Sequence, residues 1–301
     1  MAFSKGQEST EGVQIKRYVG VASSYVLAVN PSKEELEKHF GRELENAPVY
    51  VSEAEVNGKK VPQVKIDFLI QADPAKYKDA EGSALDLKTR VTFFLRRAGR
   101  TSSAGKWQII DKYGRTAWAT EEEIQQHKVP VYGNGKPANI DSAYRKAYDG
   151  EESLIKFLIA YLGIQAPATY VNGEWVTNDA DKLADSEASL EHIEDYFKGD
   201  VSELRSIIAL QPNNKVKVCY GVRKADDGRE FQTTYTRMFL KNRATNYSKL
   251  DEDIQKAKNA GAMPTVEFDT TELHEFVVTP TTFEEPATAD LPFDTASTPW
   301  G

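Results

Sequence analysis

The chain reads Leu85-Asp86-Leu87-Lys88-Thr89-Arg90-Val91-Thr92-Phe93-Phe94-Leu95-Arg96 at the point that decides the fold class. Successive side chains of a β-strand point to opposite faces of the sheet. The odd-numbered residues therefore place Leu, Leu, Thr, Val, Phe and Leu on one face, and the even-numbered residues form a polar, basic face. We expect Phe93 in the core and Phe94 on the surface, beside Lys88, Arg90 and Arg96.

Strand patterns continue on both sides of this stretch. A hairpin is predicted over 49–56 and 61–70, since Asn57-Gly58 is a strong turn signal. Further strands are expected at 13–29, with a bend at Gly20, and at 107–111, 116–119, 215–223, 231–240 and 273–278. Short turns between strands favour antiparallel pairing, as a barrel or an open sheet.

Helix signals gather in the middle of the chain. Ser32 and Thr120 are predicted N-caps, and Gly163 is expected to end a helix over 151–162. Other helices are predicted over 33–40, 186–197, 201–210 and 248–260. The sequence therefore predicts an α+β fold in which a helical insertion, about 120–212, interrupts a mostly antiparallel β core. We expect residues 1–12 to form a flexible arm, 13–278 an OB-like folded domain, and 279–301 a disordered acidic tail.

The charge of the chain is unevenly distributed. Its 301 residues carry a formal net charge of -8. Residues 267–301 hold eight acids and no Lys or Arg, so residues 1–266 sum to zero. Acidic tails of this kind compete with an anionic ligand or bind a partner protein.

Several classes of protein fit the sequence poorly. Cys219 is the only cysteine, which rules out an internal disulfide and a cysteine-based zinc site. The four histidines are scattered, and no Gly-rich loop ends in Gly-Lys-Ser/Thr. There is no signal peptide and no run of about 18 apolar residues. We therefore expect a cytoplasmic protein that is not an enzyme and has no cofactor and no membrane contact.

The most basic stretch runs from Lys88 to Trp118, with eight bases against the single acid Asp111. Aromatic residues are interleaved with these bases, and single-strand binders combine cations for phosphates with aromatic rings for bases. The hairpin over 215–243 repeats this mixture. The candidate nucleic-acid-binding residues are Lys88, Arg90, Phe94, Arg96, Arg97, Arg100, Trp107, Lys112, Tyr113 and Arg115, joined by Arg223 and Tyr235 of the second hairpin.

A structural explanation of this stretch competes with the functional one. Strands are enriched in aromatic residues in any β protein, and basic surface strands are common. Asp67, Asp111, Glu121 and Glu122 offer carboxylates that a metal-dependent nuclease needs, although their spacing does not favour a metal site. A virion-assembly protein without DNA affinity is the other alternative.

Three segments resemble phage single-stranded DNA-binding proteins of the replication modules of large tailed, crAss-like phages. They are the strand-turn-strand at 107–118 (WQIIDKYGRTAW), the segment at 231–240 (FQTTYTRMFL) and the tail motif at 289–293 (ADLPF). The last is similar to the acidic Asp-Ile-Pro-Phe ends of bacterial single-strand binders, but here eight residues, 294–301, follow it. The resemblance implies an OB-fold that holds single-stranded DNA during replication, repair and recombination in the host cytoplasm.

The resemblance also implies a role for the tail in recruiting replication proteins. The candidate partner-binding residues are Asp290, Leu291, Pro292, Phe293, Asp294 and Trp300. The tail is expected to occupy the DNA groove when DNA is absent. Oligomeric state, site size and the preference between DNA and RNA stay open.

Overall fold

The structure is a computed structural model that describes residues 16–111, 114–140, 143–164, 169–176, 188, 190–224, 229–241, 247–259 and 266–276. The strands are β1 (Tyr18–Val29), β2 (Val51–Val56), β3 (Lys59–Ala72), β4 (Lys88–Gly99), β5 (Trp107–Asp111), β6 (Thr116–Ala119), β7 (Tyr144–Lys146), β8 (Tyr148–Asp149), β9 (Thr169–Val171), β10 (Glu174–Val176), β11 (Lys215–Lys224), β12 (Glu230–Thr234), β13 (Leu240–Lys241), β14 (Val266–Phe268) and β15 (His274–Glu275). The helices are α1 (Lys33–Phe40), α2 (Glu121–Gln125), α3 (Glu151–Leu162), α5 (Ile193–Tyr196), α6 (Ser202–Leu210) and α7 (Ser248–Asn259).

The main sheet has the strand order β12-β11-β1-β3-β4-β8, and its strands pair antiparallel. Apart from β2, which precedes β3 and pairs with it, the strands β1, β3 and β4 are consecutive along the chain, and β11 returns over a long connection to lie beside β1. This spatial order, fourth-first-second-third, is that of a Greek key. The expected mixed fold with mostly antiparallel strands is confirmed.

The sheet curls around β1. This strand pairs with β11 through residues 20–25 and with β3 through residues 24–29, and the register shifts between Val26 and Ala28. A bulge of this kind bends a strand and increases its twist. At the far edge, the Thr234 hydroxyl donates to the Arg90 carbonyl of β4 at 3.3 Å, so β12 comes back against β4. The described strands do not close into a continuous barrel.

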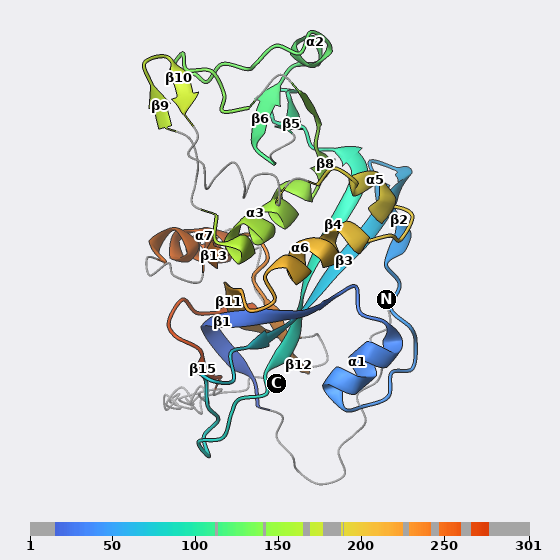
Figure 1. Cartoon of the computed structure of the whole chain (residues 1–301), viewed down its shortest axis with the longest axis vertical. Helices are drawn as coiled ribbons and strands as arrows, with labels where there is room; N and C mark the ends of the chain where they lie inside the picture. Colours follow the sequence, from blue (N-terminus) through green and yellow to red (C-terminus); the bar gives the residue numbers. More distant parts are fainter. Residues whose placement is uncertain are drawn as a thin grey trace, which may run out of the picture.

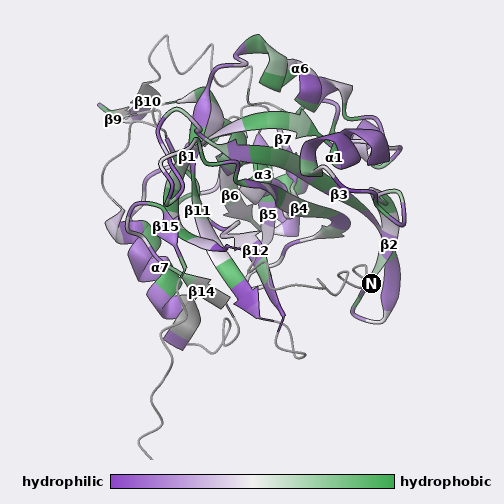
Figure 2. Cartoon of the chain, turned by 90° about the horizontal axis from the view of Figure 1, so that it is seen from below, coloured by the Kyte–Doolittle hydropathy of each residue, from purple (hydrophilic) through white to green (hydrophobic). Residues whose placement is uncertain are grey.

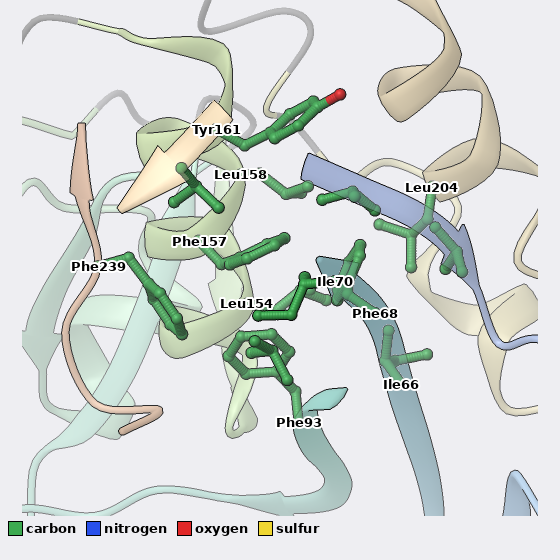
Figure 3. Close-up of a cluster of buried hydrophobic side chains, with 14 of the residues drawn as sticks. Ile66, Phe68, Ile70, Phe93, Leu154, Phe157, Leu158, Tyr161, Leu204 and Phe239 are labelled. Atoms are coloured by element: carbon green, nitrogen blue, oxygen red, sulfur yellow. The ribbon is translucent and has the colours of Figure 1, made fainter. Parts of the chain in front are cut away.

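The core fills the concave side of this curled sheet. Phe68 of β3 and Phe157 of α3 lie with ring centroids 4.5 Å apart, and Phe93 packs against both rings. Figure 3 shows Phe68 and Ile70 of β3 beside Leu154 and Phe157 of the helix, and Ile66 of the same strand belongs to the same apolar cluster. Burial of these apolar side chains is the main stabilising contribution, at roughly 25 cal/mol per Å² removed from water.

The segment 120–212 contributes to this core instead of standing apart from it. The helix α3 buries Leu154, Phe157 and Leu158 in the main apolar cluster, and α6 adds Leu204. In Figure 1, α3 and α6 lie over one side of the main sheet. The segment also holds β7, which pairs with β5, and β8, which pairs with β4. The predicted helical insertion, about 120–212, therefore holds helices together with short strands, of which β7 has three residues and β8 two.

A smaller sheet of order β6-β5-β7 extends the molecule at the end opposite α1 (Figure 1). Its own apolar cluster includes Ile109, Ala117 and Tyr144. A third cluster joins α7 to the outer side of β1 and β11 through Val21, Cys219 and Leu250. Figure 2 shows α1 and α7 as largely hydrophilic helices on the outside of the molecule.

Where the sequence contained strong local signals for a helix cap or a turn, the predicted element agrees with the structure. Ser32 and Thr120 both form capping boxes, and α3 ends at Gly163 as predicted. Asn57 and Gly58 take φ values of 52° and 73° in the β2–β3 turn. The predicted helix over 186–197 lies partly outside the described residues; within the described part Ala188 is helical and α5 covers Ile193–Tyr196. The strand predicted over 231–240 is divided into β12 and β13. The last predicted strand is only two residues, β15.

Candidate nucleic-acid interface

The polar face of β4 lies where the alternation of residues 85–96 predicts it. The side chains of Val91, Phe93 and Leu95 are buried in the core, and Phe94 is 37% exposed on the opposite face. Lys88, Arg90 and Arg96 share that outer face with Phe94 and are partly exposed. The outer side of β4 therefore presents one aromatic ring within a row of three bases, which is the predicted arrangement.

The neighbouring strand β3 adds Lys65, whose Cα is the register partner of Phe94. Lys65 was not among the candidate binding residues, although it lies on the polar side of its own strand in the sequence. Its Nζ also lies 5.8 Å from the centroid of the Tyr50 ring. The outer β3–β4 surface, defined as Lys65, Lys88, Arg90, Phe94 and Arg96, is the candidate interface.

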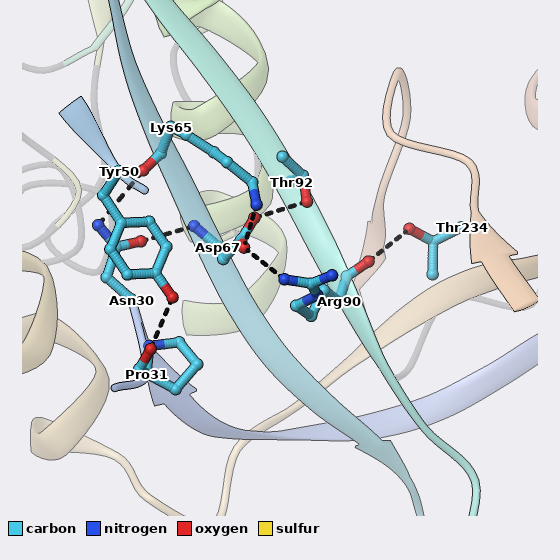
Figure 4. A network of polar contacts seen from close by, with 8 residues as sticks. All are labelled: Asn30, Pro31, Tyr50, Lys65, Asp67, Arg90, Thr92 and Thr234. Atoms are coloured by element: carbon cyan, nitrogen blue, oxygen red, sulfur yellow. Dashed lines mark hydrogen bonds and ion pairs between the residues drawn. The ribbon is translucent and has the colours of Figure 1, made fainter. Parts of the chain in front are cut away.

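A buried carboxylate organises the centre of this surface (Figure 4). Asp67 has no exposed side-chain area and contacts the Lys65 Nζ at 2.7 Å and the Arg90 Nη1 at 3.3 Å. The Thr92 hydroxyl donates to Asp67 Oδ1 at 2.6 Å, and the Asp67 amide donates to the side chain of Asn30. A buried carboxylate must be paired, so these contacts fix the two cations in place.

Tyr50 closes one side of the Asp67 network. Its hydroxyl donates to the Pro31 carbonyl at 2.7 Å. Burial raises the pKa of Tyr50 well above its ordinary value, and the nearby Asp67 carboxylate raises this pKa further. The phenol therefore stays neutral at physiological pH and acts as a hydrogen-bond donor.

The two ends of the interface carry more exposed ion pairs. Lys88 contacts Asp86 at 2.6 Å. Arg96 donates to the side-chain oxygen of Gln63 at 2.8 Å and to Asp149 Oδ2 at 3.0 Å. Exposed pairs contribute only about 0–1 kcal/mol, so a phosphate can replace either carboxylate at little cost.

Three further candidates lie beyond Arg96, toward the small sheet. Arg97 contacts Glu194 at 2.5 Å, with its guanidinium 4.8 Å from the centroid of the Phe197 ring. Arg100 lies 3.6 Å from Glu152 and 5.9 Å from the centroid of Trp118. The ring of Trp107 lies 4.1 Å from the Lys146 Nζ. Trp118, which is 36% exposed, and Lys146 were not among the candidate residues. When an aromatic residue and a base lie on different strands, the sequence alone does not show that the two side chains are neighbours.

The remaining candidates are separate from the β3–β4 surface. Arg115 contacts Asp111 at 2.8 Å and holds the turn between β5 and β6. Arg223 lies near the end of β11, opposite Phe231 of β12. Lys112, Tyr113 and the tail residues Asp290, Leu291, Pro292, Phe293, Asp294 and Trp300 lie outside the described residues.

Tyr235 requires a correction. The hairpin pattern placed it in the binding groove, but the residue is only 3% exposed and its ring packs against Phe268 at 5.4 Å between centroids. Its amide donates to the Cys219 carbonyl after β12 has ended. The strand alternation that the prediction assumed therefore does not reach Tyr235, and its ring is not available for stacking.

In comparisons with known proteins, no family model, no curated protein and no solved structure matches the chain. The interface is therefore interpreted from its own residues.

The carboxylates considered for a metal site lie apart. Asp67 is held by Lys65 and Arg90, and Asp111 by Arg115. Across the described part of the chain, no group of three or more His, Cys, Asp or Glu side chains is placed to hold a metal ion. The same part of the chain contains no helix that is long and apolar enough to cross a membrane.

Proposed function

We propose that this protein binds single-stranded DNA on the outer β3–β4 surface and coats and protects the strand during DNA replication. The observation that carries the proposal is the placement of an exposed Phe94 within a row of bases on two adjacent, rigid strands. Phosphates would contact Lys88, Arg90 and Arg96, and one base would stack on Phe94. Contacts to phosphate and to a ring face do not depend on sequence, so binding is expected to be non-specific.

The topology supports an OB-like core as part of this proposal. OB-folds are five-stranded, partly open Greek-key barrels that bind oligonucleotides on the face of their second and third strands. Here the five strands are β1, β3, β4, β11 and β12, with β12 returning to β4 through the Thr234–Arg90 contact. The second and third of these strands are β3 and β4, which carry the interface.

The ion pairs of the interface predict how binding responds to salt. Each phosphate contact releases condensed counterions, and for single strands the slope of log K against log salt is about -0.7 per phosphate. Contacts through Lys88, Arg90 and Arg96 therefore give a slope of about -2. Stacking on Phe94 adds affinity that salt screens only weakly.

The test is fluorescence anisotropy of labelled oligo-dT with the whole chain over a salt series, with and without Mg²⁺. We expect binding that weakens with a slope of about -2 or steeper, and a smaller slope for Arg96→Gln. Lys60→Gln is the matched control, because Lys60 is 80% exposed on the β2–β3 hairpin and pairs only with Glu53 in the described part of the chain.

Absence of binding at low salt would contradict the proposal and favour a virion-assembly role. Cleavage of the oligonucleotide that requires Mg²⁺ would indicate a nuclease instead. Parallel titrations with oligo-dT and oligo-U decide between DNA and RNA, since the 2′-hydroxyl is what distinguishes them at a given site.

A further inference from the structure

The face of the small sheet that is turned toward α3 carries an exposed tryptophan. Gln108 of β5 and Trp118 of β6 are register partners, so their side chains lie on the same face. The Gln108 side-chain amide donates to Glu152 Oε2 at 2.6 Å, which places this face against the first turn of α3. Gln108 is buried, whereas Trp118 is 36% exposed and is not part of the apolar cluster of the small sheet. The indole is therefore fixed on a paired strand with more than a third of its surface in solvent.

Two exposed cations share one carboxylate next to Trp118. The Arg100 guanidinium lies 5.9 Å from the centroid of the Trp118 ring and 3.6 Å from Glu152 Oε2. Lys156, one turn further along α3, contacts Glu152 Oε1 at 2.6 Å. The side chains of Arg100 and Lys156 are 57% and 54% exposed, and that of Glu152 is 24% exposed. The group carries two positive charges and one negative charge, and the positive charges are the more accessible.

Glu152 holds these cations in place. Burial acts to raise the pKa of its carboxyl group, but the hydrogen bonds from Lys156 and Gln108 and the charge of Arg100 outweigh burial and keep this pKa below its ordinary value. The carboxylate therefore stays ionised at neutral pH. Asp67 has the same arrangement on the β3–β4 surface, where it contacts two cations on the face that carries the exposed Phe94.

The end of β4 connects the Trp118 group to the β3–β4 surface. Arg96 pairs with Asp149 and Arg100 pairs with Glu152, and these two acids lie three residues apart where β8 leads into α3. From Phe94 to Arg100 the chain advances six residues, at most about 20 Å along a strand. The register of β4 against β8 shifts after Arg96, and an irregularity of this kind bends a strand. The row of bases on β4 therefore continues toward the small sheet.

We propose that Trp118 is a second base-stacking position for the strand that lies on the β3–β4 surface, and that Arg100 and Lys156 bind the phosphates next to that base. This inference rests on the proposed function. Every base has a ring face that stacks on an indole, and cations beside the ring follow the backbone of the strand. The inference extends the binding site from the main sheet to the small sheet and to α3.

The first test uses the intrinsic fluorescence of the whole chain, because a base that stacks on an indole quenches its emission. The chain has four tryptophans, at positions 107, 118, 175 and 300. Unlabelled oligo-dT of about 12 nucleotides should quench part of the emission. Trp118→Phe should lose most of this quenching and still bind, because a phenyl ring also stacks on a base. The matched control is Trp175→Phe, in the separate β9–β10 sheet, which should keep the quenching.

The second test measures affinity by anisotropy with a labelled oligonucleotide of the same length. We expect Trp118→Ala to weaken binding about 5- to 100-fold, the loss of one base–aromatic stack. Lys156→Gln should reduce the salt slope by about 0.7, the contribution of one phosphate contact. The matched control is Lys256→Gln, because Lys256 is 73% exposed on α7 and also pairs with a glutamate four residues before it.

Three results would overturn the inference while leaving the proposed function intact. The first is quenching by oligo-dT that persists unchanged in Trp118→Phe. The second is a Trp118→Ala chain that binds as tightly as Tyr132→Ala, which removes another exposed ring. The third is an equal loss of binding in Trp118→Phe and Trp118→Ala, which would show that the indole supports the small sheet and not a base. If the unmodified chain binds no oligo-dT, the proposed function and this inference both fail.

Discussion

At the scale of single residues, Phe93 and Phe94 show how strand alternation assigns opposite roles to identical side chains. Phe93 packs with ring centroids 5.9 Å from Phe68 and 5.6 Å from Phe157. Phe94, its neighbour in sequence, leaves more than a third of its surface in solvent. An exposed phenyl ring among bases contributes little to folding, so its proposed contribution is to binding.

The first prediction concerns Phe94→Ala. Loss of one base–aromatic stack should weaken oligo-dT binding by about 1–3 kcal/mol, while the salt slope stays unchanged because no cation is removed. Anisotropy titrations at two salt concentrations measure both quantities. Phe94→Tyr should retain binding. The control Tyr132→Ala removes another exposed aromatic ring, 44% accessible and away from this strand, and should have no effect. A parallel loss in both alanine variants would argue against stacking on Phe94.

Which bases are paired could not be predicted from the sequence. The pattern at 88–118 indicated a strongly positive surface, but Arg90, Arg96 and Arg100 each contact a carboxylate from a distant segment. Asp149 and Glu152 lie more than fifty residues from the arginines they contact. Strand alternation is a local property and gave the correct face, whereas charge compensation depends on tertiary contacts and was missed.

At the scale of elements, the junction between β4 and α3 joins the interface to the core. Gly150 precedes α3 with φ 86°, and a Cβ at this position would lie 2.1 Å from the Phe94 carbonyl. Arg145 and the backbone amide of Tyr148 donate to Glu151 in the first turn of the helix. The backbone of the proposed binding strand therefore packs directly on the start of the central helix.

The second prediction is that Gly150→Ala destabilises the protein by about 2–5 kcal/mol, because a left-handed residue and a steric overlap with backbone act together. Gly163→Ala is the matched control: it has φ 71° at the other end of the same helix, and nothing lies within 4 Å of its Cβ position. It should cost only about 1–2 kcal/mol. Urea unfolding followed by circular dichroism measures both. Equal losses would show that backbone conformation alone matters and that the contact with Phe94 does not.

Elements with strong local signals were predictable, and short ones were not. The capping boxes and the Asn57-Gly58 turn depend on side chains within four residues, so the sequence contains the whole interaction. The strands β7 and β8 have three and two residues, and they are strands only because β5 and β4 lie beside them. Their hydrogen bonds come from the tertiary structure.

At the scale of the whole molecule, the sequence predicted an antiparallel sheet but not the order of its strands. The placement of β11 beside β1 depends on a contact between residues such as Gly20 and Tyr220, two hundred positions apart. That order brings β12 back to β4, while β3 and β4 lie side by side with Lys65 of β3 and Lys88, Arg90 and Arg96 of β4 on the outer face. The candidate surface therefore depends on a topology that no local pattern reports.

The last prediction concerns the acidic tail, which lies outside the described residues. Residues 280–301 hold four acids and no Lys or Arg, so a chain ending at Thr279 has a net charge of -4 in place of -8. If the tail competes with DNA for the β3–β4 surface, the shortened chain should bind oligo-dT about 3- to 10-fold more tightly at about 50 mM salt, and the difference should shrink by about 300 mM as screening increases. Anisotropy titrations of the whole and shortened chains measure this.

A full-length variant with Glu284→Gln, Glu285→Gln, Asp290→Asn and Asp294→Asn separates charge from length and should behave like the shortened chain. Equal affinities for all three proteins at every salt concentration would show that the tail does not compete for the surface, and its role would then be restricted to binding partner proteins.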